Sequence, residues 1–182
     1  MSSEGNRDLV SDLLSLDDKR RRAALASLRT GLGKAPGEAP RMLPYMAKHL
    51  VASDPGAPAV RAAFLVASLY AMHPDHAKGV SVGKALRRGV RSGKLGEDGT
   101  AARLVAMIDA HPDDIQHHVE GLMRLCETSK EGIDWYWFHR DIRGLMAEGS
   151  SDGERTRLAW ARDYWRESRE ETDDSTQQGE IE

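Results

Sequence analysis

Basic and apolar residues separate onto two sides of a helix in the segment 81–94, SVGKALRRGVRSGK. At about 100° per residue, Val82, Leu86 and Val90 form an apolar stripe. The other side carries five cations, Lys84, Arg87, Arg88, Arg91 and, just beyond the helix, Lys94. Like charges this close repel one another unless anions such as phosphates neutralise them. The pattern therefore predicts a nucleic-acid-binding surface, with a solvated basic surface as the alternative.

A second group of basic residues lies in the segment 17–34, DDKRRRAALASLRTGLGK, and in the loop that follows it. The cations expected to form this patch are Arg22, Arg29, Lys34 and Arg41. The loop contains glycines, so its backbone amides could also approach phosphate oxygens. It differs from a nucleotide-binding P-loop, which needs Ser or Thr directly after its lysine, because Ala35 stands there. We further expect Arg103 to bridge the two patches and Arg143 to add a contact.

The histidines occur in close groups that could bind a metal ion. These residues are His73, His76, His111, His117 and His118, and two aspartates, Asp113 and Asp114, lie among the last three. Adjacent helical positions such as 117 and 118 point about 100° apart, so both side chains cannot easily join one site. We therefore expect surface or capping roles for the histidines, and no bound metal or other cofactor.

Three carboxylates, Asp134, Asp141 and Glu148, are spaced by seven residues and so share a helical face. Neighbours in this series are separated by about 10 Å along the axis, which is too far for two of them to act on one atom. Ion pairs with arginines are the expected role. The nearby arginines are Arg140, Arg143 and Arg157. A Gly-x-Ser-x-Gly nucleophile turn is also missing, so we expect no catalytic site.

Helices must position these side chains, because apolar residues recur with helical periodicity and no stretch alternates as a half-buried strand would. Clusters of Gly and Pro separate the helical segments. The expected helices are 8–15, 17–31, 41–52, 58–72, 81–92, 99–110, 112–129, 134–148 and 154–170. The sequence predicts an all-α protein of about nine helices in two packed bundles, without a sheet.

Periodicity also identifies the buried faces of two C-terminal helices. In the helix after His111-Pro112, this face consists of Ile115, Val119, Leu122 and Cys126. In the helix that starts DWYWFHRDI, it consists of Trp135, Phe138, Ile142 and Leu145. We expect the lone Cys126 to be buried and inert, and the second helix to anchor the C-terminal bundle.

The charges are distributed unevenly along the 182 residues, although the formal net charge is only −3. Residues 19–103 carry sixteen bases and five acids, whereas residues 163–182 carry two bases and eight acids. A basic stretch of domain size suggests a polyanionic partner. We expect an N-terminal bundle with a basic surface at 1–95, a C-terminal bundle at 96–170, and a disordered acidic tail at 171–182.

Composition places the chain among globular proteins, with 40% hydrophobic and 30% charged residues. A single cysteine excludes an intramolecular disulfide and a thiolate zinc cluster. The most apolar run, 59–72, contains Arg61 and is shorter than the roughly 20 residues that cross a bilayer. Since the start MSSEGNRDLV is polar and unlike a signal peptide, we expect a cytoplasmic protein without a membrane partner.

Three parts of the sequence follow one another in a distinctive order over about residues 20–166. LASLRTGLGKAPGEAPRMLPYM joins an arginine-bearing helix to a glycine-proline loop and a Pro-aromatic segment. LYAMH with VSVGKALRRG forms a central helix pair, and DWYWFHRDIRGL with LAWARDYW forms the C-terminal helices. Together these parts resemble the CasB family, the small subunit of the type I-E CRISPR surveillance complex Cascade.

The resemblance implies an all-α, two-bundle scaffold protein without an active site. It implies two adjacent copies in the complex, lying along the CRISPR RNA and its target DNA and touching the repeated backbone subunit and the large subunit. Backbone binding without sequence specificity would stabilise the R-loop and the displaced strand in antiviral defence. R-loop formation is nearly balanced in free energy, so contacts to phosphates can tip it. Cleavage would be left to a separately recruited helicase-nuclease.

Two functions of other classes are compatible with the same residues. The first is a helical protein–protein adaptor, whose basic surface contacts acidic proteins and has no nucleic-acid role. The second is a helical metal-dependent hydrolase that uses the histidine and aspartate groups. Salt-sensitive binding to a protein but not to nucleic acid distinguishes the adaptor. Stoichiometric metal, with activity lost on chelation, distinguishes the hydrolase.

Overall fold

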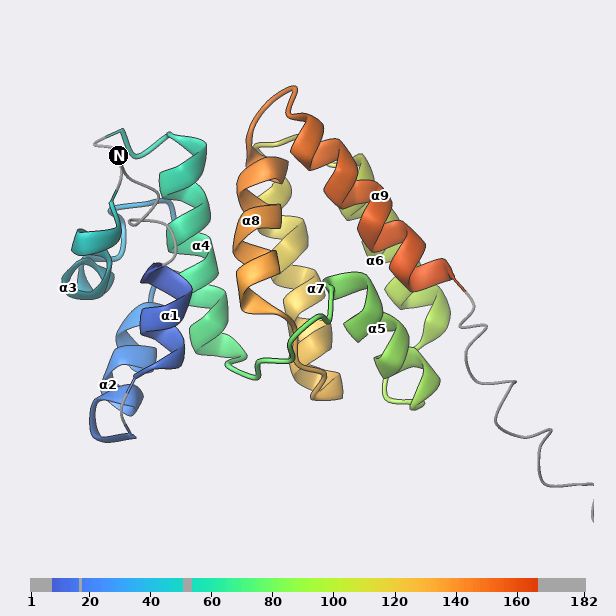
Figure 1. Ribbon diagram of the computed structural model, residues 1–182, viewed down its shortest axis with the longest axis horizontal. Coiled ribbons are helices and arrows are strands. Elements are labelled where there is room, and N and C mark those ends of the chain that lie inside the picture. The colour runs from blue at the N-terminus through green and yellow to red at the C-terminus, as the bar shows by residue number, and fades with distance from the viewer. Residues whose placement is uncertain (1–7, 17, 51–53, 167–182) are drawn as a thin grey trace, which may run out of the picture.

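The structure, a computed structural model, describes residues 8–16, 18–50 and 54–166, and the expected acidic tail at 171–182 lies outside them (Figure 1). The described residues form α-helices and short 3-10 helices, and they contain no strand beyond one isolated bridge between His76 and Ile133. The predicted all-α class with about nine helices is thus confirmed. In this part of the chain no helix is both long and apolar enough to span a membrane.

The elements follow the expected order along the chain. They are α1 (Asp8–Leu14), α2 (Asp18–Arg29), η1 (Pro40–Met42), α3 (Leu43–Met46), η2 (Ala47–His49), α4 (Pro58–Met72), α5 (Val82–Arg91), α6 (Glu97–Asp109), α7 (Ile115–Ser129), α8 (Trp135–Met146) and α9 (Ser151–Trp165). The single helix expected at 41–52 is wrong: three short turns, η1, α3 and η2, replace it. Pro44 lacks the N–H group that a regular helix would use to bond to the Pro40 carbonyl, which explains the short turns.

Helix α4 lies at the centre of the N-terminal half, between α2 and α8 (Figure 1). Every side chain from Ala62 to Met72 is buried, as expected for a helix that is apolar all round. Arg61, at its start, remains partly exposed and pairs with Asp113 at 3.1 Å. The apolar run at 59–72, which is too short to cross a bilayer, is therefore a core helix.

Aromatic side chains join α8 to the helices on both of its sides. Trp135 meets Tyr70 of α4 edge to face, with ring centroids 5.3 Å apart. Phe138 stacks on Trp160 of α9 at 6.3 Å. Phe138 and Trp135 belong to the predicted buried face of α8, all of which is buried, as is Cys126 on α7. Burial raises the pKa of the Cys126 thiol to about 12, so this group is inert at neutral pH.

The expected boundary between two bundles at residue 95 stays a prediction. Helix α5 precedes this boundary, yet it packs against α7 and α9, which follow it. Helix α4 in turn packs against α8. Helices that precede residue 95 therefore contact helices that follow it in two parts of the molecule.

Helices α5 and α9 cross so closely that only glycine fits at one position. A Cβ atom on Gly83 would lie 2.2 Å from the carbonyl oxygen of Trp160. Backbone cannot yield as a flexible side chain can, so any larger residue at 83 must separate the helices. The crossing sets the position of α5 on the rest of the molecule.

Replacing Gly83 by alanine is expected to lower the free energy of unfolding by about 1–3 kcal/mol, because the methyl group forces α5 away from α9. Gly121→Ala is the matched control: this glycine also lies within a helix, but its Cβ would meet nothing within 4 Å. The control is expected to gain about 0.5–1 kcal/mol from helix propensity alone. Urea denaturation measures both. A Gly83→Ala protein as stable as the control would contradict the close crossing.

Stability should also fall in mild acid because of His139 on α8. Its Nε2 is buried without a hydrogen-bond partner among the described residues, and burial, with smaller effects of Arg143 and His49, lowers its pKa to about 4. In the unfolded chain the His139 imidazole takes up a proton below about pH 6.5, whereas in the folded protein it stays neutral until the pH falls to about 4. We expect a loss of about 2 kcal/mol between pH 7 and pH 5. Urea denaturation of His139→Leu should show a shallower pH dependence than the unchanged protein, and equal slopes would contradict this role.

Candidate nucleic-acid interface

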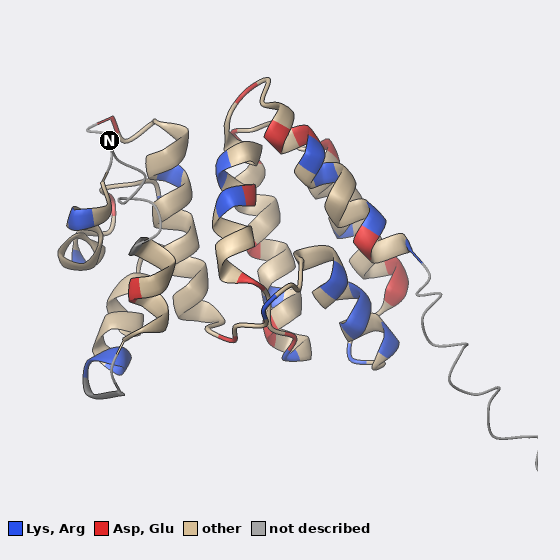
Figure 2. Cartoon of the chain, viewed as in Figure 1, with Lys and Arg blue, Asp and Glu red and all other residues tan. Residues whose placement is uncertain are grey.

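Helix α5 presents the basic stripe on its outer side. Its first turn is capped by Ser81, whose hydroxyl accepts the Lys84 N–H at 3.2 Å and donates to Asp163 of α9 at 2.6 Å. The apolar side, including Val82 and Leu86, is buried, as the helical phase predicts. We call the cations Lys84, Arg87, Arg88, Arg91 and Lys94 the α5 basic face; Figure 2 shows Lys and Arg along α5 in blue.

The five cations of this face are not equally available to a ligand. Lys84 and Arg88 are exposed and form no hydrogen bond or ion pair through their side chains with the residues that the structure describes. Arg87 is half-buried and pairs with Glu97 at 3.0 Å. Lys94 donates to the carbonyl oxygen of Ser129 at 2.7 Å. Four of the five cations are exposed, as the helical phase predicts, and Arg87 is the half-buried exception. Arg87 and Lys94 also bind α6 and α7.

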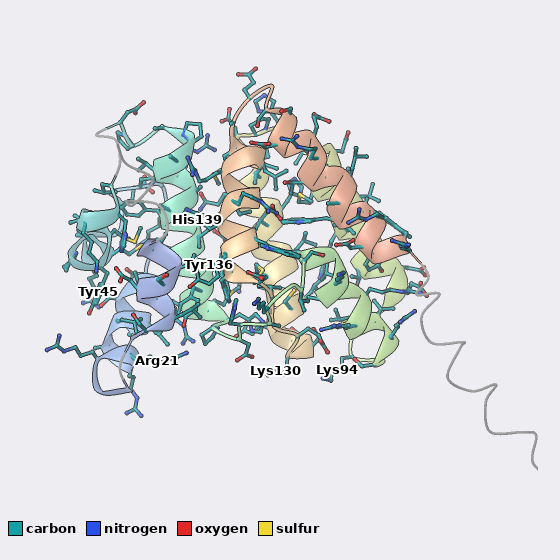
Figure 3. The ribbon with its side chains drawn as sticks, in the orientation of Figure 1. Arg21, Tyr45, Lys94, Lys130, Tyr136 and His139 are labelled. Atoms are coloured by element: carbon teal, nitrogen blue, oxygen red, sulfur yellow. The ribbon has the colours of Figure 1, made fainter. Side chains whose placement is uncertain are left out.

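Lys130 is a neighbour of this face that sequence reasoning missed. It ends α7 in the left-handed conformation, with φ of 60°, and its side chain is exposed. Figure 3 shows it beside Lys94, in keeping with the Lys94 hydrogen bond to the preceding residue, Ser129. Helical periodicity could not reveal this contact because the two lysines lie on separate helices.

The second basic patch is formed by residues that are mostly exposed. Arg22, Lys34 and Arg41 are open to solvent. Arg29 is exposed too, but its Nε donates to the Ala71 carbonyl at 2.6 Å, which ties α2 to α4. We call Arg22, Arg29, Lys34 and Arg41 the α2 patch. One of its four charges thus has a structural partner.

The two patches lie at opposite ends of the molecule. Helix α2 packs on α4, α4 on α7, and α7 on α5, so two helices intervene (Figure 1). Arg103 is exposed on α6, which packs against α5, α7 and α9. Its role as a bridge between the two patches stays a prediction. Arg143 is half-buried and lines a separate hollow of about 640 Å³ beside His139 and Arg140.

Two of the three equally spaced carboxylates have structural partners among the described residues, and these are of different kinds. Asp134 caps α8 by accepting the N–H groups of the first turn, and it also accepts the Gly79 N–H at 2.8 Å. Asp141 is buried, pairs with Arg140 at 2.8 Å and accepts the Trp160 indole N–H at 3.0 Å. The predicted arginine pairing is thus confirmed for Asp141 and wrong for Asp134. Glu148 is exposed and forms no ion pair with the described residues.

Arg157, another expected partner of these carboxylates, has a different role. Its guanidinium donates to the Met107 carbonyl at 3.2 Å and to the Ala110 carbonyl at 2.8 Å. It thereby binds carbonyl groups at the C-terminal end of α6 and in the residue that caps it. This arginine fastens α9 to α6.

The histidines form backbone contacts rather than a cluster. His73 is buried, with Nε2 2.9 Å from the Glu131 carbonyl oxygen. His76 accepts the Trp135 N–H at 3.4 Å. Within the described ranges no group of three or more His, Cys, Asp or Glu residues is placed to hold a metal ion. The geometry around these histidines therefore gives no support to a metal-dependent hydrolase.

Comparisons of the sequence and of the structure with known proteins agree on one family. Residues 24–165 match the family of CRISPR-associated protein Cse2. The CRISPR-associated protein Cse2 of Thermus thermophilus is 31% identical over 144 residues, which is 79% of each chain. A crystal structure of a Cse2-family protein from Thermus thermophilus has a TM-score of 0.70, at 28% identity, over 90% of this chain and 99% of that one.

Two further solved structures share the fold at lower identity. One is a chain of a CRISPR RNA-guided surveillance complex, with a TM-score of 0.67 at 23% identity over 88% of this chain and 94% of that one. The other is CasB from Thermobifida fusca, with a TM-score of 0.62 at 22% identity over 88% and 93%. The family match spans most of the described helices, from within α2 to the end of α9, and the chain therefore belongs to the CRISPR-associated Cse2 family, also called CasB.

Proposed function

We propose that this chain is the non-catalytic small subunit of a type I-E CRISPR Cascade complex in the cytoplasm. Family membership supports this role, and so does the fold shared with a chain of an RNA-guided surveillance complex. In such an assembly its partners are the CRISPR RNA, the target DNA, the repeated backbone subunit, the large subunit and a second copy of itself. The structural roles found for Asp134, Asp141 and His73 fit a scaffold.

The α5 basic face is the feature on which the nucleic-acid role rests. Lys84 and Arg88 are exposed cations without a protein partner among the described residues. Each phosphate that such a cation neutralises releases bound counterions, which favours binding without reading the base sequence. Protein contacts of this kind can tip R-loop formation, which is nearly balanced in free energy, and can hold the displaced strand.

The remaining candidates extend this interface. Arg103 and Lys94 lie on the α5 side, and Arg91 is exposed on α5 itself. The α2 patch, at the other end of the molecule, would meet a different stretch of nucleic acid. Arg143 would add a cation in the hollow beside α8. Two separated patches suit a subunit that lies along an extended ligand.

Binding to labelled single-stranded DNA, duplex DNA and RNA across a salt series tests the proposal. We expect affinity to fall steeply as salt rises, with little dependence on base sequence, because backbone charges dominate. Fluorescence anisotropy with probes of matched length and different sequence measures this. Absence of binding to all three probes at low salt, together with salt-sensitive binding to a protein, would instead support the adaptor function.

Reversing the charge of one exposed cation on α5 should weaken binding. Each lost phosphate contact lowers affinity about fivefold at about 0.1 M salt and reduces the salt slope by about 0.7 for single strands. We expect at least this loss for Arg88→Glu. Arg155→Glu is the matched control, since Arg155 is exposed on the N-terminal half of α9 and pairs only with exposed Asp152. An equal loss in both variants would mean that overall charge, and not the α5 basic face, governs binding.

A further inference from the structure

The last turn of α9 runs beside the α5 basic face. Asp163 accepts the Ser81 hydroxyl at the start of α5 at 2.6 Å. Tyr164 donates to the carbonyl oxygen of Glu97 at 3.4 Å, and the Glu97 carboxylate pairs with Arg87 of α5. The described chain therefore ends, at Arg166, next to the cations of α5.

The sequence beyond this point is strongly acidic. Residues 167–182 contain one base, Arg169, and seven acids. The acids are Glu167, Glu170, Glu171, Asp173, Asp174, Glu180 and Glu182. The net charge of this segment, −6, is opposite in sign to the five cations of the α5 basic face and similar in size. The family match ends at residue 165, before this segment begins.

The segment is long enough to reach every cation of the face. A fully extended chain covers about 3.3–3.6 Å per residue, so sixteen residues can span roughly 50 Å. Helix α5 has 10 residues and a length of about 15 Å. Because the segment is attached beside the face, its effective concentration there is in the millimolar range. Even if the segment binds the face weakly, the bound state would therefore be populated.

We propose that residues 167–182 bind the α5 basic face of their own chain and compete there with nucleic-acid phosphates. The carboxylates lie against Lys84 and Arg88, the cations that have no partner among the described residues. The competition rests on the proposed function, whereas the contact within the chain does not. Exposed ion pairs are individually weak and are screened by salt. The segment therefore competes well with a nucleic acid that is bound weakly and non-specifically. A nucleic acid that forms many contacts displaces it.

The contact itself can be tested without any nucleic acid. A carbodiimide joins a carboxylate directly to a lysine amine, with loss of water to the reagent, only where the two groups touch. In the full-length protein we expect peptide mass spectrometry to find links from residues 167–182 to Lys84 and Lys94, and fewer as salt rises. Lys34, exposed beside the first half of α7, is the internal reference. Links to Lys34 as frequent as links to Lys84 would overturn the contact.

The competition is tested by neutralising charges in the full-length chain. The variant Glu170→Gln/Glu171→Gln/Asp174→Asn is expected to bind single-stranded DNA about three- to tenfold more tightly at low salt, because the occupied fraction of the face falls. Its matched control is Asp109→Asn/Glu148→Gln/Glu154→Gln, which removes the same charge at exposed positions. Asp109 and Glu154 stand at the ends of α6 and α9 away from Tyr164 and Glu97. The control should change affinity much less.

The outcomes separate this inference from the proposed function. Equal gains in affinity for both triple variants would overturn the competition and leave nucleic-acid binding in place. Absence of nucleic-acid binding in every variant would overturn the proposed function and with it the competition. In that case the links to Lys84 would still decide whether the segment contacts the α5 basic face.

Discussion

The aromatic packing of α8 against α4 and α9 is the constraint on which the rest of the structure depends. Trp135 contacts Tyr70 on one side, and Phe138 stacks on Trp160 on the other. Buried aromatic pairs contribute free energy beyond the area they bury. Asp141 adds direction, because its hydrogen bond to the Trp160 indole admits one placement of α9. Since α9 carries α5, this packing also sets how far the α5 basic face lies from the α2 patch.

Local pattern was enough to predict much of the fold. Helix α4 spans the predicted residues 58–72, and the apolar side of α5 is buried as its phase requires. The prediction of a single helix at 41–52 was wrong because periodicity does not register the missing N–H group of Pro44. For α4 and α5, the residues that decide the structure lie within a few positions of one another, so the sequence can be interpreted directly.

The candidate site was less predictable, because the partners of its cations are remote in sequence. The hydrogen bond from Arg29 joins it to the end of α4, and that from Lys94 joins it to the end of α7. Arg103 has the right charge, but the packing of α6 places it on the α5 side. Helical phase predicts which side chains face outward from their own helix. It does not predict which other helix those side chains contact.

Helix α5 is fastened at both ends, through Ser81 to α9 and through Lys94 to α7. The backbone positions of its cations therefore keep a constant spacing, since each residue advances about 1.5 Å along the axis. A ligand must adapt its own charges to this rigid row. A single strand can do so by rotating its backbone bonds, whereas duplex DNA stays stiff over about 150 base pairs. For the proposed nucleic-acid ligand, this difference in mechanical compliance would favour single strands over duplexes without contact to a single base.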